Sequence, residues 1–122
     1  MKKPNKDQIR EDRIENEAIP DANGPEEQAA SWHCYLEDKL QFPFQAKCTA
    51  AVLVSPLEKG ETVEVIDMAP EDLCAHDMLV LIRWNSRKLA VPLSQLKPID
   101  TDEDSTEAIA DWHYWVARGY LL

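Results

Sequence analysis

Short strands separated by turns fill the middle of the chain, residues 42–99, and this pattern constrains the fold more than any other feature. The stretches FPFQAKCTAAVLV and ETVEVIDMA are separated by SPLEKG, and MLVLIRW and KLAVPL flank NSR, a turn near Asn85 and Ser86. Strands joined by turns this short pair in antiparallel fashion. Four or five such strands predict a small antiparallel SH3-like β-barrel, in which Pro92 must lie at an edge or a bulge.

Two helical patterns precede the strand region. The stretch QIREDRIENEAI contains good helix formers and must end before Pro20. After the turn-rich PDANGP, a second helix is predicted to begin at Pro25, because proline suits the first helical position. The buried face of this helix is expected to consist of apolar residues at helical spacing: Ala29, Trp32, Leu36 and Leu40.

A third helix is predicted near the C-terminal end. Asp104 is expected to cap it, with Glu107 three residues further on, as in a capping box. Its apolar stripe is predicted to be Ile109, Trp112, Trp115 and Val116. The fold class is therefore α+β, with helices at both ends of the barrel. We interpret the chain as a single domain, 1–122, with an acidic helical segment (1–41), the barrel (42–99), and an acidic linker with the C-terminal helix (100–122).

The negative charge is concentrated in two flanks of the sequence. The chain contains 23 acids against 13 lysines and arginines, which gives a net charge of −10. Residues 14–41 contribute −6 and residues 100–122 contribute −5, whereas residues 42–99 contribute only −1. Duplex nucleic acid requires a basic protein face, so we expect no nucleic-acid partner.

Other features argue against further classes. No apolar run approaches the roughly 18 residues that a membrane span needs, and no apolar segment follows the N-terminal lysines, as a secretory signal requires. Cys34, Cys48 and Cys74 form an odd set without a CxxC pair, which indicates reduced thiols in a cytoplasmic protein. Because no nucleophile turn, glycine-rich phosphate loop or HExxH pattern is present, we interpret the chain as a non-enzyme. We also expect it to be a monomer without membrane contact.

The run IDTDED, residues 99–104, raises the question of a metal site. Read as an EF-hand loop that starts at Asp100, it supplies several acids but has serine where the sharp turn needs glycine. A solvated linker that ends in a helix cap explains Asp104 equally well. That interpretation leaves Asp100 and Asp102 without a role, unless they assist a second, weaker site.

A calcium site does not require contiguous ligands, because the ion accepts about six to eight hard oxygens in irregular geometry. Two acidic flanks brought together repel each other, and a divalent cation between them removes that penalty. Glu37 and Asp38 end the second predicted helix, where free carbonyl oxygens are also available, although both acids have Lys39 and Lys47 as alternative partners. Charge clustering adds further candidates: Glu17, Asp21, Asp100, Asp102 and Asp104.

Several separated stretches carry a resemblance to a known family: GPEEQAASWHCYLEDKLQFPFQAKC, SPLEKGETVEVIDMA, LAVPLSQL and AIADWHYWVARGY. From about Arg10 to Tyr120, the chain resembles the cyanobacterial calcium-binding protein family of the CcbP type. The resemblance implies a small, soluble, acidic, non-EF-hand protein that binds Ca²⁺ reversibly. Such a protein is a calcium buffer or a sensor in signalling, and a sensor has a regulatory protein partner. The resemblance also implies that the acid of YLEDKL, Asp38, is the principal ligand.

Two other interpretations compete with calcium binding. A zinc site is disfavoured because Cys74-x-His76 has no second closely spaced pair of ligands. An SH3-like protein-interaction module without metal dependence is the main alternative, and its acidity would serve solubility or attraction to a basic partner. Arg83, Arg87 and Lys88 surround the predicted hairpin turn, and we interpret them as a solvated tip rather than a binding surface.

Overall fold

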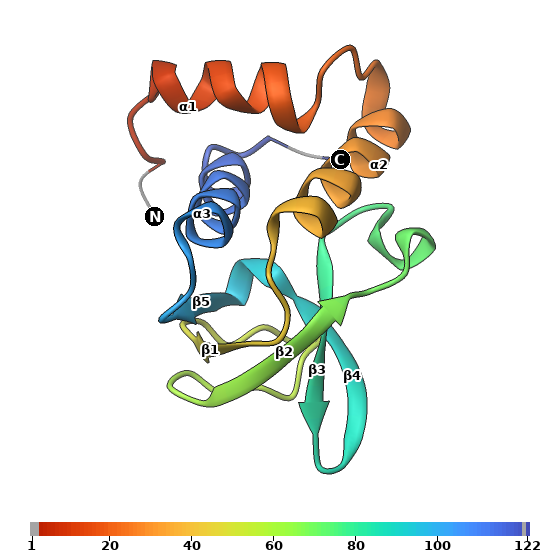
Figure 1. Ribbon diagram of the computed structural model, residues 1–122, viewed down its shortest axis with the longest axis vertical. Helices are drawn as coiled ribbons and strands as arrows, with labels where there is room; N and C mark the ends of the chain where they lie inside the picture. The colour runs from red at the N-terminus through yellow and green to blue at the C-terminus, as the bar shows by residue number, and fades with distance from the viewer. Residues whose placement is uncertain (1–2, 121) are drawn as a thin grey trace.

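The computed structural model describes residues 3–120 and 122. Figure 1 shows the strands at one end of the molecule and the helices at the other. The elements in chain order are helix α1 (Gln8–Arg13), the π-helical turn η1 (Ile14–Ala18), helix α2 (Gly24–Lys39), strands β1 (Phe44–Cys48) and β2 (Thr62–Met68), the 3₁₀-helix η2 (Glu71–Cys74), strands β3 (Leu79–Trp84) and β4 (Arg87–Pro92), the 3₁₀-helix η3 (Leu93–Gln95), strand β5 (Leu96–Ile99) and helix α3 (Glu103–Ala117).

The described strands form one antiparallel sheet in the order β4-β3-β2-β1-β5. The turn η3 carries the chain from β4, at one edge, to β5, which pairs with β1 at the other edge. The α+β class is thus confirmed, and Pro92 does lie on an edge strand. Because β4 and β5 do not pair with each other among the described strands, the sheet is not closed, and the SH3-like barrel stays a prediction.

Local irregularities of the sheet follow from the sequence. Asn85 and Ser86 both have positive φ, 46° and 65°, which is the conformation of a tight hairpin turn between β3 and β4. The predicted hairpin is confirmed at these residues. Between Val65 and Asp67 the register of β2 against β3 shifts, as at a β-bulge. This bulge breaks the alternation of polar and apolar residues in TVEVIDM.

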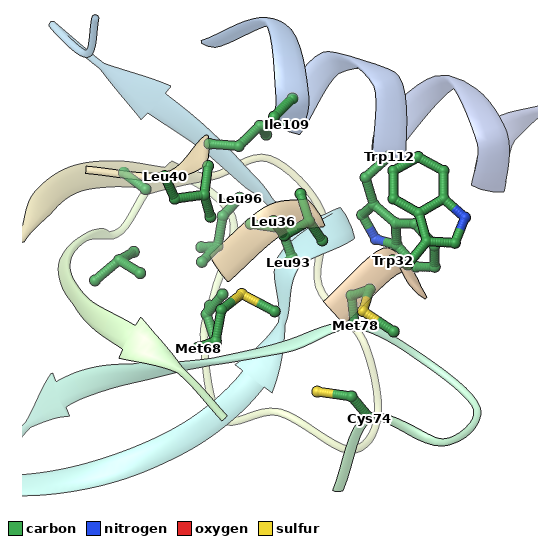
Figure 2. Close-up of a cluster of buried hydrophobic side chains, with 14 of the residues drawn as sticks. Trp32, Leu36, Leu40, Met68, Cys74, Met78, Leu93, Leu96, Ile109 and Trp112 are labelled. Carbon is green, nitrogen blue, oxygen red and sulfur yellow. The ribbon is translucent and has the colours of Figure 1, made fainter. Parts of the chain in front are cut away.

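The core lies between the sheet and the packed pair α2 and α3. The ring of Trp32 in α2 meets Trp112 and Trp115 of α3 at centroid distances of 5.0 and 5.8 Å. Figure 2 shows Trp32 and Trp112 together at one end of the core, near Met78. The predicted apolar face of α2 is confirmed, since all four of its members are buried. On α3 the prediction is wrong for Val116, which is 39% exposed, whereas Ile109, Trp112 and Trp115 are buried.

The indole nitrogens differ from expectation. Buried tryptophan N–H groups usually find a partner, but the Nε1–H groups of Trp32 and Trp112 are buried and donate to no acceptor among the described residues. Both rings lie deep in the core, away from its rim. At the end of α3, Gly119 adopts φ +85° and turns the chain, so that Tyr120 and Leu122 pack against the core. Leu121, which was expected to do the same, lies outside the described residues.

Replacement of Leu36 by alanine tests this core. Leu36 is fully buried between α2 and the sheet, and the Leu36→Ala variant is expected to lose about 2–5 kcal/mol of unfolding free energy through lost burial and a residual cavity. Urea unfolding measures the loss. The matched control is Leu53→Ala, because Leu53 is exposed and should change stability by less than about 0.5 kcal/mol. Equal losses in the two variants would contradict the placement of the core.

Candidate metal centre

A buried carboxylate in α3 positions the N-terminal helical segment. Asp111 has no exposed surface, and its Oδ1 accepts hydrogen bonds from Arg10 Nη1 at 2.7 Å and Arg13 Nη2 at 2.7 Å. Arg13 Nε reaches Oδ2 at 2.9 Å, and the hydroxyl of Tyr35 in α2 donates to the same oxygen at 3.1 Å. One carboxylate therefore joins the N-terminal segment, α2 and α3. We call this group of four residues the Asp111 clamp.

The clamp shifts the pKa values of two of its members, Arg13 and Tyr35. The hydrogen bond to Asp111 raises the pKa of Arg13, so the guanidinium stays charged at every accessible pH. Burial, followed by the Asp111 charge, raises the pKa of Tyr35, so its hydroxyl remains a donor. From the sequence, Asp111 was counted in an acidic flank and at the last ligand position of the EF-hand reading that starts at Asp100, not in the core. The signal that identifies it is its place on the buried face of α3, three residues after Ala108 and four before Trp115.

A second polar contact holds the start of the same segment. Glu11 Oε2 accepts hydrogen bonds from the hydroxyls of Tyr114, at 2.6 Å, and Tyr120, at 2.9 Å. The apolar contribution is small, because only Ile14 and Ala18 are buried in α1 and η1. The segment is therefore docked mainly by polar groups. Figure 1 shows it on the far side of α2 and α3 from the sheet.

The docked segment brings Glu17 to the end of α2. After Arg13 the helix widens into the π-helical turn η1, a rare conformation that is frequent at functional sites. Ser31 of α2 donates to the carbonyl of Ala18 at 2.5 Å and fixes the turn in place. Glu17 and Asp38 then line one pocket of about 460 Å³, together with Ser31, Tyr35 and other residues. We call it the α2 pocket.

The α2 pocket has the electrostatic character that a cation needs. Asp38 lies in the last turn of α2, where the helix dipole places partial negative charge and where carbonyl oxygens lack helical partners. Glu17 adds a second carboxylate from a segment 21 positions away in sequence, and both acids are exposed to solvent. Lys39, which lines the same pocket, is the competing cation that the sequence suggested.

The two acidic flanks meet where α2 ends and α3 begins. The backbone N–H of Gln41 donates to Ser105 Oγ at 2.9 Å, and Ser105 Oγ also contacts the carbonyl oxygen of Lys39 at 3.4 Å. The expectation that these flanks are neighbours is therefore confirmed at this junction. The negative end of α2 lies against the positive end of α3, which is favourable for both helix dipoles.

The helix cap at this junction was predicted at the wrong acid. Asp102, not Asp104, is the N-cap of α3, because its carboxylate accepts from the backbone N–H of Ser105 at 3.1 Å and from the Ser105 hydroxyl at 2.6 Å. These two hydrogen bonds hold the pKa of Asp102 below its usual value. Asp104 lies in the first turn instead. A carboxylate engaged as a cap is a poor candidate for a metal ligand.

Asp104 faces a different pocket, of about 480 Å³, with Glu103, Glu107 and Arg10 among its lining residues. This site opposes a cation in two ways. Arg10 already supplies a positive charge, and Arg13 Nε lies 3.5 Å from Glu107 Oε1. The amino-terminal end of α3 also contributes partial positive charge. The structure thus separates Asp104 from Asp38 rather than joining them.

The remaining candidates are dispersed. Glu37 is exposed in the last turn of α2 but does not line the α2 pocket. Asp21 and Asp100 occupy exposed turns with positive φ, 56° and 51°. Over residues 3–120 and 122, no group of three or more His, Cys, Asp or Glu side chains is arranged to hold a metal ion. The carboxylates of Glu17 and Asp38 fit a calcium site that is completed by other oxygens, not a closed acidic cage.

Taken together, these features define an acidic α+β protein in which two carboxylates, Glu17 and Asp38, line one pocket at the end of a helix. The calcium-binding CcbP family, described as "Calcium binding", matches residues 12–116, and the chain belongs to this family.

Two solved structures are similar to the chain over its length. The crystal structure of Anabaena CcbP is 43% identical, with a TM-score of 0.87 and 100% of each chain covered. A calcium-binding protein in its calcium-binding form is also 43% identical, with a TM-score of 0.85 and 98% of each chain covered. No functionally curated protein matches the chain.

Within the described residues, no helix has both the length and the apolarity to span a bilayer.

The clamp predicts a large stability loss for Asp111→Asn. The amide removes the buried anionic partner that Arg10 and Arg13 share, and we expect a loss of about 3 kcal/mol, the low end for a broken buried pair because both guanidinium groups are partly exposed. Urea unfolding measures the loss, and limited proteolysis should show faster cleavage before residue 20. Asp72→Asn, an exposed acid in η2, is the matched control and should behave as wild type. Wild-type resistance of the Asp111→Asn chain would contradict the clamp.

The Asp102 cap predicts a pH-dependent contribution to stability. Its folded pKa lies below the ordinary aspartate value, so the contribution is complete above about pH 4 and is lost as the pH falls through the folded pKa. The Asp102→Asn variant should be less stable than wild type at pH 7, and the difference should shrink toward pH 2. Chemical unfolding at several pH values measures it. A difference that does not depend on pH would contradict the assignment of the cap.

Proposed function

We propose that the chain binds Ca²⁺ reversibly at the α2 pocket, with Asp38 as the principal ligand and Glu17 as the second carboxylate. One observation carries the proposal: two acids that are distant in sequence line one pocket at the carboxyl end of a helix. Membership of a calcium-binding family supports it. Ser31, helix-end carbonyl groups and water would supply the remaining oxygens.

The donor set favours calcium over softer metals. Calcium accepts carboxylate, carbonyl and water oxygens in irregular geometry, whereas zinc prefers nitrogen and sulfur in a tetrahedron. Cys34 lines the pocket, but no histidine accompanies it. Magnesium requires near-octahedral geometry and releases its waters reluctantly, which suits an open two-carboxylate site less well.

The role that fits this site is that of a cytoplasmic calcium buffer acting as a monomer, without catalytic activity. An exposed site with two carboxylates binds weakly and exchanges readily, which a buffer requires. The three cysteines are free, as in a reducing compartment. A sensor role, with a regulatory partner, would follow if calcium tightens the contact between η1 and α2, since the two ligands belong to these two elements.

Isothermal titration with Ca²⁺ tests the proposal. Wild type should bind calcium more tightly than Mg²⁺, and a hundredfold excess over the dissociation constant should add about 2.7 kcal/mol to the unfolding free energy. Asp38→Asn should weaken binding roughly tenfold or more, which is about 1.4 kcal/mol. Glu17→Gln should weaken it by a smaller factor.

The control for these variants is again Asp72→Asn, which removes the same charge at a residue that does not line the pocket. It should bind calcium as wild type does, and all three variants should keep the circular dichroism spectrum of the apo protein. If Asp38→Asn and Asp72→Asn weaken binding equally, calcium responds only to net charge. If Glu103→Gln or Asp104→Asn is the variant that removes binding, the ion lies at the start of α3 and the proposal is wrong.

A further inference from the structure

Two lysines with the same charge lie side by side on the sheet, away from the α2 pocket. Lys47 of β1 and Lys97 of β5 are directly opposite each other in the antiparallel register, and both are exposed. Like charges in this position destabilise a sheet. Neither lysine has an ion-pair partner among the described residues, although the chain contains 23 acids. The fold therefore leaves a local positive site uncompensated on an acidic protein.

An apolar pocket adjoins this lysine pair. It has a volume of about 270 Å³ and lies between β5 and α3, with walls that include Lys97, Pro98, Ile109 and Ala110. Its other polar groups are already engaged, since Thr106 Oγ1 lies 2.6 Å from Thr101 Oγ1 and His113 Nε2 lies 3.1 Å from the carbonyl oxygen of Leu93. Burial lowers the pKa of His113, so the ring is neutral at pH 7. Lys97 is then the charged group of this pocket.

The neighbouring loop between β1 and β2 exposes further apolar surface. It begins at Thr49, which lines the same pocket. The loop is anchored there, because Gln95 Nε2 donates to the carbonyl oxygen of Ala50 at 2.9 Å. A few residues on, Leu53 is fully exposed and Val54 is 85% exposed. Large aliphatic side chains exposed on a loop that begins at an apolar pocket are typical of an interaction surface.

We propose that this corner, formed by Lys47, Lys97 and the pocket between β5 and α3, docks an acidic peptide segment of another protein. Carboxylates of the segment pair with the two lysines, and one of its aliphatic side chains enters the pocket. The pocket has room for one such side chain. A nucleic acid is disfavoured, because its phosphates make no use of the apolar pocket beside the lysines. The inference is independent of calcium binding.

The probe is a short fluorescein-labelled peptide of aspartates and glutamates with one central leucine, titrated in EDTA and read by anisotropy. EDTA ensures that a failure of calcium binding does not affect the result. Wild type should bind this peptide and bind a version with serine in place of leucine more weakly. Lys47→Gln and Lys97→Gln should each weaken binding roughly two- to fivefold, and the double variant roughly tenfold. Ala110→Leu, which fills the pocket, should weaken it by a similar factor.

Matched controls separate the corner from general charge and helix effects. The variants Lys88→Gln and Ala117→Leu should bind as wild type does. Lys88 is an exposed residue of β4, and Ala117 is an exposed residue at the end of α3. Circular dichroism and the melting temperature establish that each variant is folded, and relief of the lysine repulsion should leave the Lys47→Gln and Lys97→Gln variants at least as stable as wild type. The proposal is overturned if the peptide does not bind wild type or binds the double lysine variant equally well. It is also overturned if oligothymidylate binds there more tightly than the peptide, or if light scattering shows a dimer that the double variant loses.

Discussion

The carboxylate of Asp111 determines how the helical half of the molecule is assembled. It lies fully buried in α3 and accepts hydrogen bonds from two arginines of the N-terminal segment and from Tyr35 of α2. Without these partners a buried charge is strongly unfavourable, so the segment that supplies the arginines must dock. Since the segment continues directly into η1, its docking also determines where Glu17 lies. The α2 pocket, which Tyr35 also lines, therefore depends on the Asp111 clamp.

With Ca²⁺ at the site that we propose, calcium affinity would be linked to the docking of the N-terminal segment. Asp38 belongs to α2, whose position is secured by Trp32 and Leu36 in the core. Glu17 belongs to a segment with little buried apolar surface. A ligand that holds Glu17 and Asp38 together stabilises the docked segment, and the clamp in turn preorganises the ligand pair. Calcium binding and docking of the N-terminal segment would stabilise each other by the same free energy, as linkage requires.

Much of the fold was predictable because it depends on local patterns. Helical spacing identified the buried face of α2, and the NSR turn identified the hairpin at Asn85 and Ser86. The errors arose where the outcome depends on tertiary contacts. Asp104 and Asp102 are equally good caps in sequence, and only the contact of Ser105 with the end of α2 selects Asp102. Closure of the sheet depends on whether the edges β4 and β5 pair, and the strand pattern carries no information about that.

The site was predictable only in part for a related reason. Charge clustering selected Glu17 and Asp38, which the fold brings to one pocket, but it equally selected Asp21, Asp100 and Asp104, which the fold disperses. Clustering in sequence indicates the local density of charge but not the direction in which each side chain points in the fold. It also did not distinguish Asp111, which is buried and hydrogen-bonded, from the solvated acids around it. Burial periodicity in α3 separates it from its neighbours, because it lies on the same face as Trp115.

The position of the ion in crystals grown with Ca²⁺ tests the account most directly. We expect density for one ion in the α2 pocket, with oxygen atoms of both Glu17 and Asp38 at about 2.3–2.6 Å and with the Asp111 hydrogen bonds to both arginines intact. An ion bound at the amino-terminal end of α3, or bound by Asp38 while Glu17 points into solvent, would contradict it.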